Sequence, residues 1–286
     1  MSRVIEPGAD DGLGRLCSAG DDVVFAAPSY PGIERIEARF AGDAYSRHRH
    51  DAYAIGVTMQ GVQSFWYRGE RRASLPGQII ILHPDEEHDG GAGNELGLLY
   101  RMLYIEPILL QESLGLAGGL PFVANPVVDD PALRRALMAV LDDLEADIEP
   151  LGADQFSAEL ADGLLRQAGG PARRAMLLDV PALKRARDYL DEAEGELVRS
   201  EALEAVSGLD RFTLARQFRS YCGTSPHRYL IMRRMDRGRR LLVSGAAIAD
   251  VAAATGFADQ SHFHRHFRKA FGVTPGRWQK LAARRE

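Results

Sequence analysis

The chain has 286 residues, of which 45% are hydrophobic and 26% are charged, and its formal net charge is −5. This length suggests about two domains, each able to bury its own core. The composition excludes a disordered, collagenous or disulfide-scaffolded protein, with only Cys17 and Cys222 far apart in the chain. The net negative charge also argues against a nucleic-acid-binding protein, since such proteins are often basic.

Residues 1–30 carry no periodic apolar pattern, and we expect a poorly ordered N-terminal arm there. They lack the basic and apolar segments of a signal peptide. No run in the chain approaches the 18 apolar residues that a membrane span requires. These observations predict a cytoplasmic protein with no membrane partner.

From about residue 32 to residue 105 the sequence is typical of short β-strands. Apolar runs follow one another at close spacing, and turn signals separate them at Gly61, Arg68-Gly69 and His83-Pro84. This pattern predicts an all-β barrel or sandwich.

Two amphipathic helices follow the predicted strands. Asp130 and Pro131 form an N-cap and first-turn pair. Apolar residues then recur every three or four positions, at Leu133, Leu137, Val140 and Leu144 and again at Phe156, Leu160 and Leu164. These apolar stripes could pack within the chain or form the seam of a homodimer, and the pattern leaves both open.

The breaker-rich residues 168–171 predict a linker, so we expect one domain over residues 31–167, a linker over 168–180 and a helical domain over 181–286. The net charge is −13 over residues 1–180 and +8 over residues 181–286. The overall charge is therefore an average of two opposed halves, and the basic half is a candidate for polyphosphate contact.

The basic half contains an internal repeat. Residues match at a constant offset of 49 positions, which predicts a duplicated unit. The matched pairs are Arg216 and Arg265, Phe218 and Phe267, Arg219 and Arg268, Gly223 and Gly272, Ser225 and Thr274, Pro226 and Pro275, Arg228 and Arg277, and Tyr229 and Trp278.

Each copy of the repeat is predicted to form a short helix, a glycine turn and a polar second helix. In the second copy, Gly256 supplies the turn and Asp259 the N-cap of a helix whose inward face carries three phenylalanines. This is the helix-turn-helix arrangement, which lays its second helix in the major groove of DNA. Ser225 and Pro226 begin a bridge helix that runs to about Val243 and joins the two units.

Residues 181–282 resemble the DNA-binding domain of the AraC/XylS family of transcriptional regulators. The second copy carries the most specific match, through Ile248-Ala249-Asp250-Val251-Ala252, Gly256-Phe257, Ser261-His262-Phe263, Phe267-Arg268, Gly272 and Thr274-Pro275. The match of the first copy is weaker. Glu204 replaces a usual small alanine there, and Gly238 in the bridge helix replaces a better helix former. We expect both changes to loosen the first unit without removing its recognition helix.

The resemblance implies which side chains face the DNA. Base-facing positions are Arg211, Phe212, Ala215 and Arg216 in the first unit and Gln260, Ser261, His264 and Arg265 in the second. Phosphate-facing positions are Arg219, Arg228, Arg268, Lys269 and Arg277. Because Arg216 and Arg265 occur in both copies, a shared phosphate or structural role is an alternative to base recognition for them.

His48 and His50 form an H-x-H pair on a predicted strand, so their rings point the same way. With the later His88, the pattern is similar to that of metal-binding cupins, but their further carboxylate ligand would fall at Ala54 or Ile55. Three neutral imidazoles can hold zinc, so a metal site is one alternative. The favoured interpretation is that these histidines line a ligand pocket or cap a strand, with no cofactor.

The front half resembles the sensor domain of the same family, a small β-barrel that binds an effector and is followed by helices that often dimerise. The matching residues are His48, His50, Tyr53, Tyr67-Arg68-Gly69-Glu70, Gly77, Pro84 and His88-Asp89-Gly90. The implied pocket residues are His48, His50, Tyr53, Trp66 and His88. A tryptophan face suits a sugar or an aromatic metabolite, although Phe65, Trp66 and Tyr67 cannot all face one pocket.

These patterns together predict an α+β multidomain protein. It has an N-terminal cupin-like β-barrel with flanking helices and a C-terminal all-α domain with two helix-turn-helix units joined by a bridge helix. The predicted function is a non-enzymatic, homodimeric regulator that binds double-stranded DNA in response to a small molecule. One alternative is a metal-dependent cupin enzyme fused to a DNA-binding module. Another is a barrel that only dimerises, which predicts a filled core with no cavity beside His48 and His88.

Overall fold

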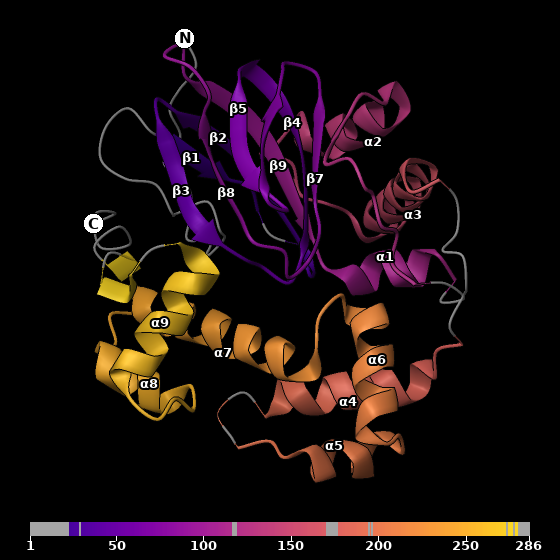
Figure 1. Ribbon diagram of the computed structural model, residues 1–286, viewed down its shortest axis with the longest axis vertical. Helices are drawn as coiled ribbons and strands as arrows, with labels where there is room; N and C mark the ends of the chain where they lie inside the picture. The colour runs from indigo at the N-terminus through magenta and orange to yellow at the C-terminus, as the bar shows by residue number, and fades with distance from the viewer. Residues whose placement is uncertain are drawn as a thin grey trace.

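The computed structural model describes residues 23–28, 30–115, 119–169, 177–193, 195, 197–272, 274–276 and 278–279. The N-terminal half forms a body of strands flanked by helices, and the C-terminal half forms a body of helices against one end of it (Figure 1). None of the helices among these residues combines the length and the apolar character that a membrane span needs. The predicted α+β architecture with two different domains is confirmed.

The strands form two antiparallel sheets. The first has the order β1-β2-β9-β4-β7-β10 and the second has the order β3-β8-β5-β6. The strands are β1 (Val23–Ala26), β2 (Ile33–Phe40), β3 (Asp43–His48), β4 (Tyr53–Gly61), β5 (Gln63–Tyr67), β6 (Glu70–Ser74), β7 (Ile79–Leu82), β8 (His88–Ala92), β9 (Leu98–Ile105) and β10 (Val127–Val128).

Apolar side chains fill the space between the two sheets. Phe40 comes from the first sheet and Phe65 and Tyr67 from the second, and each is only 1% exposed. Successive residues of a strand point to opposite faces, so these aromatic residues and their alternate neighbours form a continuous core. The interior of this barrel-like sandwich is therefore largely packed.

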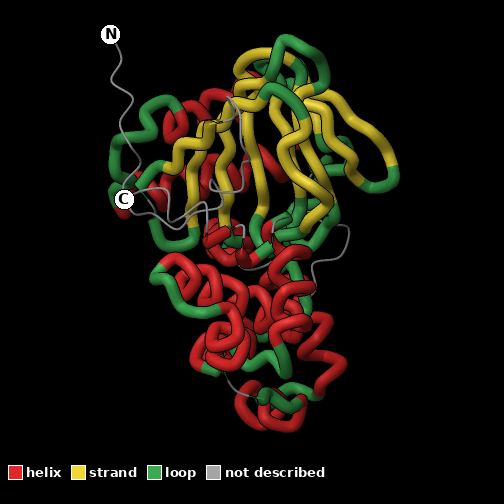
Figure 2. The backbone as a smooth tube through the Cα atoms, turned by 90° about the vertical axis from the view of Figure 1, so that its left-hand side faces the viewer, coloured by secondary structure: helices red, strands yellow, loops and turns green. Residues whose placement is uncertain are grey.

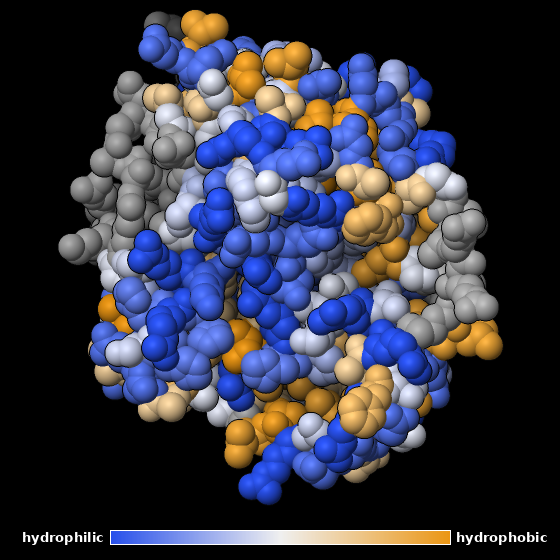
Figure 3. Space-filling view, in the orientation of Figure 1, coloured by the Kyte–Doolittle hydropathy of each residue, from blue (hydrophilic) through white to orange (hydrophobic). Residues whose placement is uncertain are grey.

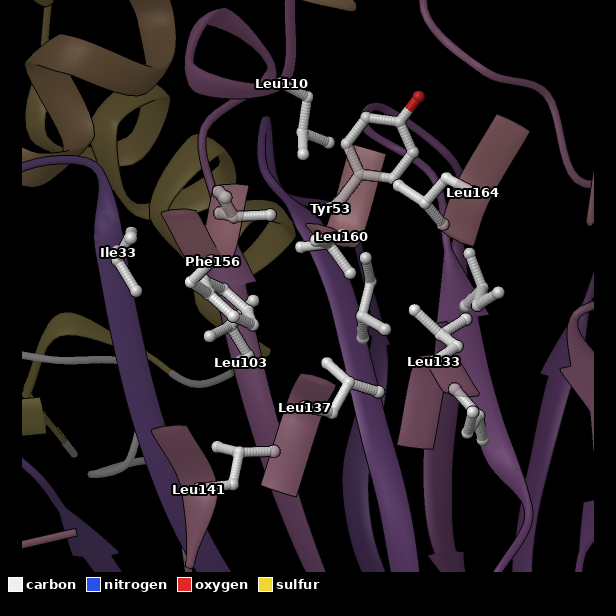
Figure 4. Close-up of a cluster of buried hydrophobic side chains, with 14 of the residues drawn as sticks. Ile33, Tyr53, Leu103, Leu110, Leu133, Leu137, Leu141, Phe156, Leu160 and Leu164 are labelled. Atoms are coloured by element: carbon white, nitrogen blue, oxygen red, sulfur yellow. The ribbon is translucent and has the colours of Figure 1, made fainter. Parts of the chain in front are cut away.

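Three helices cover the other face of the six-stranded sheet: α1 (Pro107–Ser113), α2 (Pro131–Leu141) and α3 (Pro150–Gln167). Leu133 and Leu137 of α2 and Leu160 of α3 are fully buried against this sheet (Figure 4). Burying one such side chain stabilises the fold by about 1.5–3 kcal/mol. The apolar stripes thus pack within the chain, and the idea that they form a dimer seam is wrong.

Three predicted boundaries need correction. Part of the expected N-terminal arm is ordered, since β1 pairs with β2 along its whole length, whereas residues 1–22 lie outside the described residues. Part of the expected linker, residues 170–176, also lies outside the described residues, and Val180 already begins a helix. The first of the two amphipathic helices ends at Leu141, so Leu144 lies beyond it.

The C-terminal domain consists of helices gathered beneath the strands (Figure 2). They are α4 (Val180–Glu192), α5 (Ser200–Ser207), α6 (Arg211–Cys222), α7 (Pro226–Val243), α8 (Ile248–Ala254) and α9 (Gln260–Phe271). The two helix-turn-helix units are α5–α6 and α8–α9, and α7 is the bridge between them. We refer to α6 and α9 as the recognition helices.

The turns inside both units have the predicted residues. Gly208 has a φ of 79° and Gly256 a φ of 73°, a left-handed conformation that glycine adopts without steric cost. Asp210 then caps α6 by accepting from the backbone N–H groups of Phe212 and Thr213. Asp259 caps α9 by accepting from the N–H of His262. These caps satisfy donors that a helix N-terminus leaves unpaired.

The two departures from the family pattern make specific contacts in the structure, and the expectation that they loosen the first unit stays a prediction. Glu204 accepts from the backbone N–H of Arg211 at 2.8 Å and from its guanidinium at 3.0 Å, which joins α5 to α6. A Cβ at Gly238 would lie 2.8 Å from the ring of Phe263. A glycine there lets α9 approach α7 closely.

Candidate nucleic-acid interface and effector site

The first recognition helix, α6, buries one face and exposes the other. Leu214 and Phe218 lie in the core, whereas Phe212, Ala215, Arg216 and Arg219 are exposed. Phe212 is 80% exposed, which is unusual for so large an apolar side chain. Arg211 is also exposed, but Glu204 and Glu201 pair with its guanidinium at 3.0 and 3.6 Å.

The second recognition helix, α9, has the same two-faced form. Phe263, Phe267 and Phe271 are buried with Trp278 beneath the helix, as their spacing predicted. The predicted DNA-facing residues lie on the opposite side: Gln260, Ser261, Arg265, Arg268 and Lys269 are exposed, and His264 is half-buried. Exposed polar and basic side chains on one helix face match the chemistry of major-groove binding.

One of the predicted phosphate contacts, Arg228, differs from the others. Arg228 is half-buried, and its Nε lies 3.0 Å from Oδ1 of Asp85 in the sensor domain. It therefore holds the domains together in this arrangement and is not presented to solvent for a phosphate. Arg277 lies outside the residues whose side chains are described.

The predicted histidine cluster forms. His48 on β3 pairs directly with His88 on β8, and His50 follows the end of β3. The ring centroids of His48 and His50 lie 4.3 and 4.7 Å from that of His88, and all three side chains are buried. The cluster therefore sits where β3 and β8 approach the helical domain.

Burial lowers the pKa of each of these histidines, so the rings are neutral at pH 7. The pKa of His50 falls to about 4 because of burial and the neighbouring His48. Each Nδ1 lies within hydrogen-bond distance of a backbone carbonyl, at 2.8 Å for His48 and His50 and 2.9 Å for His88. These contacts hold the rings in place.

The other two predicted pocket residues lie elsewhere. Trp66 alternates with the core residues Phe65 and Tyr67, so it points outward, where the guanidinium of Arg47 stacks 4.1 Å from its ring centroid. Tyr53 faces α1 and α3, as Figure 4 shows, and its hydroxyl donates to the carbonyl of Pro121 at 2.9 Å. Neither residue belongs to a pocket with the histidines, because strand alternation places both on the wrong face.

Each half of the chain matches a known protein domain family. Residues 30–169 match the AraC-like ligand binding domain and residues 203–281 match a helix-turn-helix domain. The chain belongs to the AraC family of transcriptional regulators. The transcriptional activator RhaS of Escherichia fergusonii is 27% identical over 254 residues, covering 84% of this chain and 89% of RhaS. An uncharacterized regulator of Bacillus subtilis, YbfI, is 25% identical over 237 residues, covering 79% of this chain and 85% of YbfI.

Among solved structures, ToxT from Vibrio cholerae matches with a TM-score of 0.61 at 12% identity, covering 87% of this chain and 98% of ToxT. This likeness extends across both domains and concerns the fold. The chain is thus an AraC-type regulator with an N-terminal ligand-binding domain and a C-terminal helix-turn-helix DNA-binding domain, as the sequence predicted. The fused cupin enzyme is not favoured.

Both recognition helices of this regulator end against the sensor domain. At the end of α9, the Oγ of Ser46 donates to the carbonyl of Gly272 at 2.7 Å, and the N–H of Arg49 donates to the carbonyl of Lys269 at 3.2 Å. Beyond the end of α6, Thr224 donates to Asp85 at 3.3 Å. The sensor domain therefore contacts the two elements that would enter DNA.

Opposite charges form much of the contact between the domains. Arg233 of α7 lies 2.6 Å from Asp51 and 3.3 Å from Glu106, both in the sensor domain, and Arg239 lies 3.5 Å from Glu34. Burial lowers the pKa of Arg233, but attraction to Asp51, Asp236 and Glu106 outweighs it and keeps the guanidinium charged. We call Arg233, Asp51, Glu106 and Asp236 the interdomain clamp. Figure 3 shows that the band where the domains meet is largely hydrophilic.

A cavity of about 230 Å³ lies beside the clamp. Its wall includes His50 and Tyr104 from the sensor domain and Arg239 and Phe271 from the DNA-binding domain. Small-molecule sites are usually concave, with a few convergent polar groups, so this cavity is a candidate effector site. The cavity was not predictable from the sequence because its walls come from segments far apart in the chain. The opposed charges of the two halves were the one signal that pointed toward it.

Proposed function

We propose that this regulator binds DNA through the exposed faces of α6 and α9, and that an effector bound between its domains controls how these helices are presented. The observation that carries the proposal is the attachment of both recognition helices to the sensor domain beside a cavity. Interfaces between domains that are rich in polar contacts separate readily. An effector acts on such an equilibrium through its different affinities for the docked and undocked arrangements.

For the DNA contacts, we assign base recognition to the exposed residues near the start of each recognition helix. Gln260 suits adenine and Arg265 suits guanine through paired hydrogen bonds, whereas Phe212 and Ala215 suit a thymine methyl group. Phosphate contacts then fall to Arg219, Arg268 and Lys269, which are exposed further along these helices. Base recognition is also proposed for Ser261, His264 and Arg216. Two further arginines are paired in the docked arrangement. Arg211 would have to leave Glu204 before it could contact a base, and Arg228 would have to leave Asp85 before it could contact a phosphate.

The effector we propose is a small molecule with several hydroxyl groups, such as a sugar. The cavity is smaller than a typical site for a drug-sized ligand. Carboxylates accept from hydroxyl groups and guanidinium groups donate to them, and both line this cavity, at Glu34, Asp236 and Arg239. Tyr30 and Tyr104 supply aromatic walls for a sugar ring.

We further propose that the regulator acts as a homodimer in the cytoplasm and has no catalytic step. A dimer would need a surface other than the apolar stripes of α2 and α3, because these are buried on the sheet. Sedimentation equilibrium of the full chain tests the oligomeric state, and a monomer at micromolar concentration would contradict the dimer.

The test of the proposed function is selection of bound DNA fragments by the purified protein, with and without a panel of sugars. Arg265→Ala should then weaken binding to a selected fragment by roughly 10-fold or more, at a stated salt concentration. Arg135→Ala, which removes an exposed arginine of α2, is the matched control. Unchanged affinity and selectivity in Arg265→Ala would contradict the role assigned to α9.

A further inference from the structure

The three buried histidines of the sensor domain form a preorganised ligand set. The ring nitrogens with which His48, His50 and His88 could bind a metal ion all lie within 4.8 Å of one another. A tetrahedral zinc ion with Zn–N distances of about 2.1 Å holds its nitrogens about 3.4 Å apart. The present spacing therefore leaves room for an ion and requires only a modest closure of the rings.

The hydrogen bonds of the cluster select which nitrogen of each ring points inward. Because each Nδ1 lies against a backbone carbonyl, each ring carries its proton there and directs an unprotonated Nε2 away from it. The Nε2 of His50 is buried and has no hydrogen-bond partner. Metal-binding histidines almost always donate their second ring N–H in this way, which fixes their tautomer and orientation. A buried acceptor with no partner is costly, and a metal ion would satisfy it.

We propose that His48, His50 and His88 bind a divalent transition-metal ion such as Zn²⁺, and that this ion stabilises the docked arrangement of the two domains. Imidazole suits zinc and its first-row neighbours. Among the described residues the cluster contains these three histidines and no carboxylate. Three protein ligands leave a fourth position for water or a small ligand.

The link between metal binding and the docking of the two domains is inferred from the location of the histidine cluster. In the short segment 46–51, ligands and interdomain contacts are interleaved: His48 and His50 belong to the cluster, whereas Ser46, Arg49 and Asp51 contact α9 and α7. An ion that joins this segment to His88 on β8 would therefore hold all three contacts in place. The proposal requires that the contacts with α7 and α9 hold segment 46–51 in the conformation in which its two histidines meet His88. The ion then binds the docked arrangement more tightly and shifts the equilibrium toward it.

Metal binding can be tested on the full chain without DNA. The chelator-treated protein should bind one equivalent of Co²⁺ with the visible absorption of a tetrahedral site, and Zn²⁺ should displace the Co²⁺. Zn²⁺ at roughly 100 times its dissociation constant should raise the midpoint of thermal unfolding by roughly 5–10 °C. His88→Gln and His48→Gln should lose both effects. His227→Gln, which changes an exposed histidine of α7, should retain them.

Far-ultraviolet circular dichroism of the metal-free variants shows whether they are folded. A folded wild-type chain that binds no Co²⁺ or Zn²⁺ would overturn the proposed site. Binding that persists unchanged in His88→Gln would also overturn it.

The link to docking rests on the proposed function and has a separate test. Zn²⁺ should reduce the radius of gyration of the wild-type chain in solution scattering, and it should weaken binding to a selected DNA fragment by a factor of ten or more. His88→Gln should show neither response. If Zn²⁺ binds with one equivalent but alters neither quantity, the metal site stands and the link to docking is wrong. If Zn²⁺ lowers the radius of gyration but leaves the affinity for DNA unchanged, docking does not control DNA binding. That result would contradict the part of the proposed function in which docking controls the recognition helices.

Discussion

Replacing Asp51 by asparagine should loosen the docking of the DNA-binding domain on the sensor domain. The substitution preserves the size of the side chain and removes one negative charge from the interdomain clamp. The Oδ2 of Asp51 lies 2.6 Å from Nη2 of Arg233, and both side chains are mostly buried, with 14% and 19% exposure. The carbonyl oxygen of the asparagine amide can still accept a hydrogen bond from Arg233, so only the ionic part of the contact is lost.

A hydrogen bond to a charged group contributes about 1.5–3 kcal/mol, and the asparagine amide keeps part of this because Arg233 stays charged. The substitution should therefore cost about 1–2 kcal/mol of docking free energy, which multiplies the undocked population by about 5–30. Adding Glu106→Gln, which weakens the second contact of Arg233 at 3.3 Å, should increase this population further. Neighbouring substitutions are not expected to be strictly additive.

The assay is solution scattering of the full chain, combined with titration of a selected DNA fragment in the absence of effector. Asp51→Asn should increase the radius of gyration and tighten DNA binding, and the double variant should increase both effects. Asp142→Asn is the matched control, because Asp142 pairs at 2.9 Å with Arg101 of the same domain and is 78% exposed. If Asp51→Asn behaves like Asp142→Asn in both measurements, the clamp does not control docking.

Three further predictions concern the recognition helices. Gly238→Ala should lower the free energy of unfolding by up to about 2 kcal/mol, because overpacking against Phe263 costs about 1–3 kcal/mol and outweighs a gain of about 1 kcal/mol in helix propensity. Gly152→Ala is the control, because space is open around its added Cβ, and it should raise the free energy of unfolding by up to about 1 kcal/mol. Urea titration measures both variants, and an equal rise in the free energy of unfolding for the two would refute the close approach of α9 to α7. Phe212→Ala should leave the thermal midpoint within about 2 °C but weaken binding to a selected DNA fragment, since its ring is 80% exposed. Phe267→Ala should lower the free energy of unfolding by about 3–5 kcal/mol in urea, because the ring is fully buried, and a loss below about 1 kcal/mol would contradict its place in the core.

Much of the DNA-binding domain was predictable from the sequence because its signals are local. Asp210 and Asp259 cap the recognition helices through the N–H groups two or three residues ahead, and Gly208 and Gly256 supply the turns before them. Helix periodicity then separated the buried phenylalanines of α9 from its exposed face. Such relations depend on a few neighbouring residues, so no knowledge of the tertiary structure was needed.

The candidate effector site was predicted only in part. The two-residue spacing of His48 and His50 pointed to the histidine cluster, although β3 ends at His48 and His50 reaches the cluster from the segment after the strand. Strand alternation also places Trp66 and Tyr53 away from the histidines. The sequence could not show this, because it does not reveal which face of each strand points into the space between the two sheets. Both faces of β4 are buried, one by the second sheet and one by helices, so apolar alternation gave no signal there.

The sequence by itself determined the two domains, the duplicated helix-turn-helix units and the opposed charges of −13 and +8. Only the tertiary structure decided how much of the basic charge is available to DNA. Arg228, Arg233 and Arg239 pair with carboxylates of the sensor domain, so their charge serves the contact between domains in the docked arrangement. The physical reason is that an ion pair depends on distance in space, and these partners are far apart along the chain.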